Sequence, residues 1–197
     1  MKAITDIIPD DRIKTKKSNP HKDVQGRDIH TTHQPENEVL NILQENGYDF
    51  VVTHPCSKFS ALLKAVEEEP RMRAIPVTRE EEGVGICAGA YLAGKKPFML
   101  IQSSGLGNSF NALASLIKTY KMPLLILASY RGYYHEIIPA QKPLGSALPN
   151  MLEAIEIPFH IISKSHEEFE MTIIEHSNDE HPYVILLSPE FFKNAKI

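Results

Sequence analysis

One run in the second half of the chain reads Leu124-Leu125-Ile126-Leu127-Ala128-Ser129. It is apolar at every position up to the final serine, whereas a strand with one face in water would alternate apolar and polar residues. Continuous apolar strands are typical of parallel sheets that carry helices on both faces. The run therefore predicts a strand of a parallel α/β sheet, buried on both sides.

Further short strands are predicted on either side of this run, and a helical pattern separates each pair. The predicted strands are residues 50–53, 74–77, 97–102, 124–129, 159–163 and 183–187. Strands that alternate with helices in this way predict one doubly wound, six-stranded parallel sheet with helices on both faces. In such sheets the functional loops follow the carboxyl ends of the strands, so the chemistry is expected there.

Several residues mark the ends of the helices. Gly47 is expected to cap the end of the first helix, and Ser165 with Glu168 forms a predicted capping box at the start of the last one. A helix is expected from Thr78 to Gly94 and another through about Lys118. A long loop is then expected before a short helix; its prolines are Pro139, Pro143 and Pro149.

Composition limits the class of protein. The chain has 197 residues, of which 42% are hydrophobic and 23% charged, and its net charge of −4 is not typical of a nucleic-acid binder. The longest apolar run, residues 122–128, is too short to span a membrane, and residues 1–11 show no signal-peptide pattern. Two cysteines, Cys56 and Cys87, are too few for a disulfide scaffold. A cytoplasmic protein with no membrane association is expected.

Residues 1–35 differ in composition from the rest, with seven Lys or Arg, five Asp and only scattered aliphatic residues. We interpret them as an N-terminal arm, flexible or draped over a partner, that precedes a domain of residues 36–197. Its histidines, His21, His30 and His33, leave a metal site open as the alternative. No Cys or Glu completes a ligand set there at helical spacing, and no metal site is predicted.

The loop after the second predicted strand reads Thr78-Arg79-Glu80-Glu81-Glu82-Gly83. Thr78 and Glu81 have capping-box spacing, and acidic residues in a first helical turn also complement the helix dipole. Helix initiation alone could therefore account for the glutamates. It leaves Glu80 unassigned, however, at a corner where its side chain can point over the edge of the sheet.

The glycines that follow, Gly83, Gly85 and Gly89, come close to a dinucleotide-binding fingerprint. Their spacing does not match it, and the preceding glutamates would repel a pyrophosphate. Close packing of the helix on the sheet explains these glycines better than a Rossmann site does.

The loop after the third predicted strand reads Gln102-Ser103-Ser104-Gly105-Leu106-Gly107-Asn108. Its glycines would let a ligand approach the backbone, and the following helix offers free N–H groups. It lacks the Gly-Lys-Ser/Thr ending of a P-loop, so a triphosphate site is not expected. An ordinary strand-to-helix turn remains the alternative.

Two other loops hold groups with possible chemistry. In the loop of residues 54–57, Cys56 could be a nucleophile or simply a packed small residue. The segment of residues 131–145 could bind an anionic substrate or be a solvated surface loop; its polar residues are Arg131, His135, Gln141 and Lys142.

Taken together, these motifs resemble the pyrimidine-binding (Pyr) domain of thiamine-diphosphate-dependent 2-oxo acid decarboxylases. The resemblance covers about residues 36–190, and Gln141 and Gly145 resemble a further loop of that family. The family usually has Asn where this chain has Ser103, which weakens one polar contact. The motifs that carry the resemblance are residues 55–57, 78–83, 88–94 and 102–108.

The resemblance implies specific roles for site residues. The family has a glutamate nine residues before the glycine of its helix motif, and counting back from Gly89 gives Glu80 as the catalytic residue. That glutamate hydrogen-bonds N1′ of the cofactor's aminopyrimidine, favours its imino tautomer and so promotes loss of the thiazolium proton. The implied cofactor-binding residues are Glu80, Pro55, Gln102, Gly105, Leu106, Gly107 and Asn108. The implied substrate-binding residues are His54, Ser57, Arg79, Ser104, Arg131 and Gln141.

The resemblance also implies a partner. The Gly-Asp-Gly motif that in this family holds Mg²⁺ and the diphosphate does not occur in the chain, so a separate beta subunit is expected to carry the diphosphate-binding domain. The expected assembly is a hetero-oligomer of at least α2β2. The implied reaction is decarboxylation of a small anionic 2-oxo acid, 3-sulfopyruvate, to sulfoacetaldehyde on the route to coenzyme M. Phosphonopyruvate as substrate, or a non-catalytic α/β binding or regulatory subunit, are the alternatives.

Overall fold

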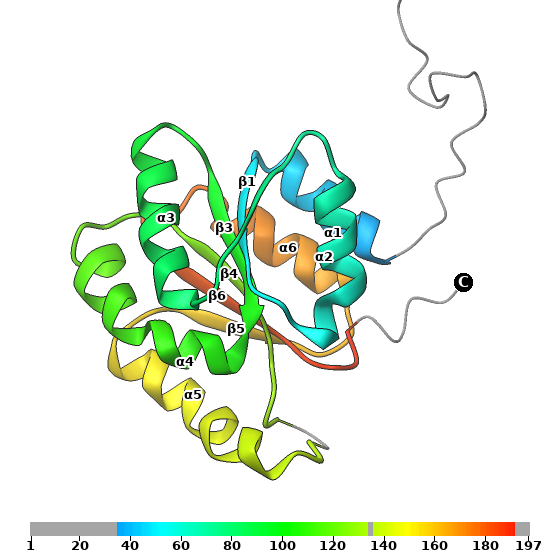
Figure 1. Ribbon diagram of the computed structural model, residues 1–197, viewed down its shortest axis with the longest axis vertical. Helices are drawn as coiled ribbons and strands as arrows, with labels where there is room; N and C mark the ends of the chain where they lie inside the picture. Colours follow the sequence, from blue (N-terminus) through cyan, green and yellow to red (C-terminus); the bar gives the residue numbers. More distant parts are fainter. Residues whose placement is uncertain (1–34, 134–135, 192–197) are drawn as a thin grey trace, which may run out of the picture. The chain divides into compact units, whose positions relative to one another are not determined.

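The computed structural model describes residues 35–133 and 136–191 (Figure 1). The proposed N-terminal arm, except for Pro35, and its histidines lie outside the described residues, as does His135. The described part contains no helix that is both long and apolar enough to cross a membrane.

The strands form a single six-stranded sheet in the order β2-β1-β3-β4-β6-β5. Every neighbouring pair is parallel, so the predicted fold class is confirmed. The boundaries differ from the predicted ones by at most one residue at either end. The strands are β1 (Phe50–Thr53), β2 (Arg73–Pro76), β3 (Pro97–Gln102), β4 (Leu125–Ser129), β5 (Phe159–Ile162) and β6 (Tyr183–Leu187).

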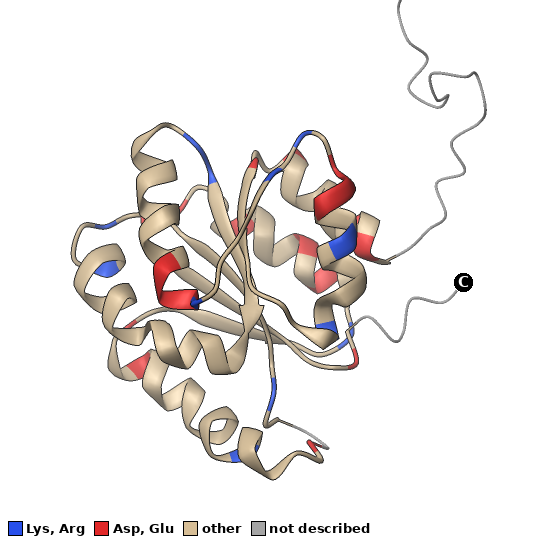
Figure 2. Cartoon of the chain, viewed as in Figure 1, with Lys and Arg blue, Asp and Glu red and all other residues tan. Residues whose placement is uncertain are grey.

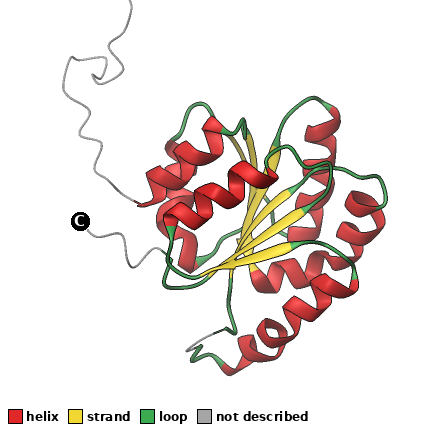
Figure 3. Ribbon diagram, turned by 180° about the vertical axis from the view of Figure 1, so that it is seen from behind, coloured by secondary structure: helices red, strands yellow, loops and turns green. Residues whose placement is uncertain are grey.

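Helices cover both faces of this sheet, as Figures 1 and 3 show from opposite sides. One face packs against α1 (Pro35–Glu45), α2 (Ser60–Glu68) and α6 (His166–His176). The other face packs against α3 (Glu80–Leu92), α4 (Ser103–Ala112) and α5 (Lys142–Ala154). A π-helical segment, η2 (Leu113–Lys118), extends α4, and two short 3₁₀ turns, η1 (Ser57–Phe59) and η3 (Pro139–Gln141), complete the described elements.

Burial on both faces explains the apolar sequence of β4. Leu125 and Leu127 belong to the core under α1, α2 and α6, whereas Ile126 and Ala128 belong to the core under α3, α4 and α5. All five residues of β4 are buried, and complete burial of each large aliphatic side chain contributes about 1.5–3 kcal/mol. Alternation was absent from the sequence because this strand has no solvent-facing side.

The predicted N-cap at Ser165 and the predicted helix end at Gly47 are confirmed. The Glu168 carboxylate of the predicted capping box instead lies 2.8 Å from Nε2 of His160. The hydroxyl of Ser165 accepts a hydrogen bond from the backbone N–H of Glu168 at 3.0 Å and caps α6. Gly47 adopts a φ of +85° after α1, a conformation that disfavours residues with a β-carbon.

The predicted capping box at Thr78 is wrong. Helix α3 begins at Glu80, so Arg79 occupies the N-cap position and makes no side-chain capping bond. The hydroxyl of Thr78 lies 3.2 Å from a carboxylate oxygen of Glu82, and the carboxylate of Glu81 pairs with Arg79 at 2.8 Å. These glutamates complement the helix dipole without forming a capping box.

Two segments predicted as turn or loop are helical. Helix α4 starts at Ser103, directly after β3, so Gly105 and Gly107 lie within its first turns. Helix α5 includes Pro143 in its first turn and Pro149 in its interior. Pro149 has no N–H for the carbonyl of Gly145, and that carbonyl accepts a hydrogen bond from the Tyr130 hydroxyl at 2.9 Å instead.

Candidate active site

Polar side chains gather where four neighbouring strands end. His54 follows β1, Glu80 follows β2 at the start of α3, Gln102 ends β3 and Ser129 ends β4. Because β2, β1, β3 and β4 are adjacent and parallel, their carboxyl ends lie along one edge of the sheet, where α/β proteins bind ligands.

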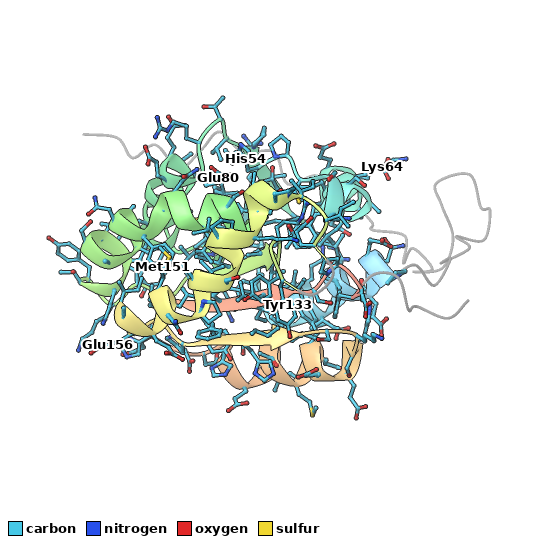
Figure 4. All side chains as sticks on the ribbon, turned by 90° about the horizontal axis from the view of Figure 1, so that it is seen from below. His54, Lys64, Glu80, Tyr133, Met151 and Glu156 are labelled. Atoms are coloured by element: carbon cyan, nitrogen blue, oxygen red, sulfur yellow. The ribbon has the colours of Figure 1, made fainter. Side chains whose placement is uncertain are left out.

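Glu80 is the buried acid of this edge. It is only 7% exposed, unlike Glu81 and Glu82, which follow it and are exposed. Its Oε1 lies 3.2 Å from Nδ1 of His54, and Figure 4 shows these two side chains beside each other. As the first residue of α3, Glu80 also lies where the free N–H groups of the helix favour negative charge. A carboxylate is therefore held at a fixed place with little access for water.

Gly105 makes room for that carboxylate. A β-carbon built on Gly105 would overlap the Oε1, Cδ and Cγ atoms of Glu80. Helices α3 and α4 pack side by side, so the amino-terminal turns of both helices meet at this carboxylate. Glycine is required at position 105 because the Glu80 side chain approaches the backbone closely, and not because the backbone there has an unusual φ.

The other glycines have different surroundings. A β-carbon on Gly83 would lie 2.6 Å from Val52 Cγ1 and 2.9 Å from Met99 Cε, which confirms close packing of the helix on the sheet at that position. Gly85 and Gly89 are exposed, and a β-carbon there would meet nothing within 4 Å. For these two glycines the packing explanation is wrong.

A polar network joins the ends of β1, β3 and β4. The side-chain amide of Gln102 donates to Ser104 Oγ at 2.6 Å and to Gln141 Oε1 at 3.3 Å. The thiol of Cys56 lies 3.1 Å from Ser129 Oγ and 4.0 Å from Gln102 Oε1. Cys56 is 6% exposed and packs in the core, in agreement with its interpretation as a packed small residue.

The remaining residues predicted to bind cofactor or substrate lie around this edge in different settings. Pro55, Ser57 and Asn108 are exposed. Leu106 is fully buried in the core, so only its backbone can face a ligand, and a β-carbon on Gly107 would lie 2.8 Å from Leu144 Cδ2. Their assignments as ligand-binding residues stay predictions.

The predicted substrate cations are already paired. Arg79 forms an ion pair with Glu81 on the surface and is 66% exposed. Arg131 is 8% exposed and binds the carboxylate of Glu136 through Nε at 2.7 Å and Nη2 at 3.1 Å. This ion pair lowers the pKa of Glu136 to about 2. Glu136 was missed from the sequence, although it is the single acidic residue between Arg131 and Gly145.

Charge is distributed unevenly around the site. Figure 2 shows acidic residues at the start of α3, whereas neighbouring α4 carries none. No Asp, Glu, Lys or Arg occurs from Ser103 through Ile117. Within residues 35–133 and 136–191, no group of three or more His, Cys, Asp or Glu could hold a metal ion. The edge therefore has a buried carboxylate and hydrogen-bonding groups, but no carboxylate cage for a cation that would bind a diphosphate.

A separate cavity of about 230 Å³ lies at the ends of β5 and β6, beyond the polar network. It contains an ion pair between Lys164 and Glu190 at 3.1 Å. The residues that line it are Tyr133, Ser163, Lys164, Ser188, Pro189 and Glu190.

Comparisons with known proteins agree with this architecture. Residues 36–145 match the family of the thiamine pyrophosphate enzyme N-terminal TPP binding domain. Among solved structures, benzoylformate decarboxylase from Polynucleobacter necessarius superimposes with a TM-score of 0.64 at 17% identity. That likeness covers 81% of this chain and 30% of the other, and it supports the fold.

More similar sequences are found among curated proteins. The sulfopyruvate decarboxylase subunit alpha of Methanococcus maripaludis is 42% identical over 80% of this chain and 96% of that protein. The sulfopyruvate decarboxylase of Methanosarcina acetivorans is 47% identical over 82% of this chain, which spans only 42% of that longer protein. A phosphonopyruvate decarboxylase of Streptomyces viridochromogenes is 30% identical over 72% of this chain and 37% of that protein. The chain belongs to the thiamine pyrophosphate enzyme family as an N-terminal TPP-binding domain, of the kind found in sulfopyruvate decarboxylase alpha subunits.

Proposed function

We propose that this chain is the alpha subunit of a thiamine-diphosphate-dependent decarboxylase that converts 3-sulfopyruvate to sulfoacetaldehyde and CO₂. The observation that carries the proposal is the buried carboxylate of Glu80, fixed between His54 and Gly105 at the start of α3. Helix initiation does not require the first-turn carboxylate to be buried, and Glu81 and Glu82 in the same turn are exposed, so the burial of Glu80 supports a catalytic over a non-catalytic subunit.

Glu80 fits the requirement of an aminopyrimidine ring. When bound, thiamine diphosphate supplies the nucleophilic carbon that adds to the 2-oxo group and accepts the electron pair released with CO₂. The Glu80 carboxyl would hold and exchange a proton at N1′ of the ring. Its low exposure keeps water from competing for that proton.

The other predicted residues complete the pyrimidine half of the site. The free N–H groups at the start of α4 and the side chain of Gln102 can bind polar groups of cofactor or substrate. The proposed cofactor-binding residues are Glu80, Pro55, Gln102, Gly105, Leu106, Gly107 and Asn108. The proposed contacts to substrate come from His54, Ser57, Arg79, Ser104 and Gln141; Arg131 is reconsidered below.

A partner subunit would supply the other half of the site. The described residues contain no carboxylate cluster for Mg²⁺, and a diphosphate needs such a cation. We propose a beta subunit that binds Mg²⁺ and the diphosphate, in a cytoplasmic complex of at least α2β2 that functions in coenzyme M biosynthesis. The name of the Methanococcus maripaludis relative, subunit alpha, supports a divided enzyme.

The test is to co-express the chain with its partner and measure release of CO₂ and sulfoacetaldehyde. Activity should require thiamine diphosphate and Mg²⁺, and kcat/KM should fall in the order sulfopyruvate, phosphonopyruvate, pyruvate. Pyruvate should be strongly rejected, because donors that face the anionic headgroup would be left unpaired. A preference for phosphonopyruvate would transfer the assignment to that substrate, and absence of any turnover would favour the non-catalytic alternative.

A further inference from the structure

The carboxylate of Glu136 is surrounded by N–H donors of its own loop. Besides the two bonds from Arg131, it accepts hydrogen bonds from the backbone N–H of Gly132 at 3.3 Å and of Ile138 at 3.0 Å. Its side chain is 7% exposed. Paired bonds from a guanidinium with two further backbone donors are among the strongest arrangements available to a carboxylate.

The ends of this loop are also held together. Gly132 has a φ of +79°, and a β-carbon there would overlap the carbonyl oxygen of Gln141 and lie 2.8 Å from Gly145 Cα. The backbone N–H of Arg131 donates to Ser103 Oγ at 3.0 Å, at the first residue of α4. The segment that starts at Arg131 therefore returns to the site edge from which it left.

Because the loop folds back to this edge, the side chain of Gln141 joins the polar network at the strand ends. Gln141 accepts from Gln102, whose amide also donates to Ser104. Ser104 and Gln102 are both proposed to contact ligands. A shift of the loop would therefore change the orientation of Gln102, because Gln141 Oε1 is one of the two acceptors of its amide.

We propose that Glu136 is a positioning residue for the active site: it closes the loop on Arg131 and holds Gln141 against Gln102. The Arg131–Glu136 ion pair assigns Arg131 to holding this loop and not to binding the substrate headgroup. Its Nε and Nη2 already bind a carboxylate, which neutralises the charge of the guanidinium. The effect on turnover rests on the proposed function; the effect on the loop does not.

The first test measures the loop in the full chain without its partner. Glu136→Gln should speed hydrogen exchange at the backbone amides of Gly132 and Ile138 by about tenfold or more, because a neutral amide is a weaker acceptor. Glu69→Gln is the matched control, because Glu69 also binds Nε and Nη2 of an arginine, Arg71, together with a backbone N–H. Glu69 precedes β2 and so lies at the opposite end of the strands. Hydrogen exchange at Gly132 and Ile138 should be unchanged in this variant. Unchanged exchange in Glu136→Gln would overturn the proposal.

The second test measures turnover of the complex reconstituted with its partner. Glu136→Gln should lower kcat by about tenfold while the KM for substrate stays within about twofold, because a displaced Gln102 would misorient the cofactor that it is proposed to bind, and misorientation lowers kcat. Glu69→Gln should leave both constants unchanged. A raised KM with unchanged kcat would indicate that Arg131 binds the headgroup, and would overturn the proposal, as would faster exchange without loss of kcat.

A third variant covers the case in which Glu136→Gln does not fold. Gln141→Ala removes the contact to Gln102 without disturbing the buried charge, so it should lower kcat similarly while Gly132 and Ile138 keep their protection. Normal kcat in Gln141→Ala would overturn the positioning role. If the wild-type complex has no activity at all, the proposed function fails, whereas the exchange measurement still decides whether Glu136 holds the loop.

Discussion

The carboxylate of Glu80 occupies the space in which a side chain on Gly105 would begin. The two residues lie in the first turns of neighbouring helices, α3 and α4, that follow different strands. The packing of α3 against α4 and the position of the proposed catalytic acid therefore both depend on Gly105, because any side chain at position 105 would displace the buried carboxylate.

Gly105→Ala should therefore damage both stability and activity. Overpacking in a rigid site costs typically about 1–3 kcal/mol, and the displaced carboxylate should lower activity of the complex at least tenfold. Gly85→Ala is the matched control, because a β-carbon there meets nothing and alanine is favoured over glycine inside a helix by about 0.5–1 kcal/mol. Urea unfolding of the isolated chain should show a lower free energy of unfolding for Gly105→Ala and a higher one for Gly85→Ala. A destabilising Gly85→Ala would contradict the open surroundings of that position in α3.

Glu80→Gln should abolish most turnover while leaving folding nearly intact. The amide keeps the shape of the side chain but cannot hold and exchange a proton, so kcat should fall by orders of magnitude. Steady-state kinetics of the complex, with circular dichroism of each variant, would measure this.

Glu81→Gln provides the comparison. Its side chain is 43% exposed and forms a surface ion pair with Arg79, so the free energy of unfolding should change by no more than about 1 kcal/mol and turnover should stay near wild type. Loss of activity in Glu81→Gln, with activity retained in Glu80→Gln, would move the catalytic role by one residue.

The stability of the chain should fall at acid pH partly through Glu136. Its pKa is lowered from an ordinary 4.5 to about 2 by Arg131 and two backbone N–H groups. A lowered pKa stabilises the folded state above the unfolded pKa, and this contribution is lost as pH falls from about 4.5 toward 2. At about 1.4 kcal/mol per pKa unit, the full shift corresponds to about 3 kcal/mol.

Urea unfolding between pH 7 and pH 3 would test this. Wild type should lose more free energy of unfolding over that range than Glu136→Gln, which has no carboxylate to protonate. Parallel pH curves for the two proteins would show that the ion pair does not contribute.

The chain alone should bind thiamine diphosphate weakly, because its described residues bring no three or more His, Cys, Asp or Glu together as a metal site and the proposed partner supplies the Mg²⁺ that binds the diphosphate. Calorimetric titration should give measurable affinity only with the partner and Mg²⁺ present. Tight binding or decarboxylation by the purified chain alone would contradict the divided site.

Hydrophobic patterning was sufficient to predict the fold. The apolar run at β4 and the alternation of strands with helices predicted the six-stranded parallel sheet, because burial on both faces leaves the same signal in any such strand. Helix starts were less predictable. Thr78 and Glu81 have the spacing of a capping box, but the spacing does not reveal that the chain stays extended at Arg79.

The position of Glu80 and Gln102 was predictable, because Gln102 ends a strand, Glu80 follows one, and the carboxyl ends of parallel strands lie along one edge of the sheet. Their roles rest on the family resemblance and stay predictions. Glu136 could not be predicted, since its importance depends on how a loop folds back on Arg131, and no periodic pattern records such a return. Pro149 was misleading for a related reason: the missing bond within α5 is replaced by the distant hydroxyl of Tyr130.

The parallel arrangement of the strands has a consequence for how the protein acquires its site. His54, Glu80, Gln102 and Gln141 are far apart in sequence, and parallel strands pair only after a long crossover has closed. Sheets with many such non-local pairings fold slowly, since each loop loses entropy before its contacts form. The site should therefore emerge late in folding, together with the centre of the sheet, and a nascent chain still lacking residue 141 could not yet possess it.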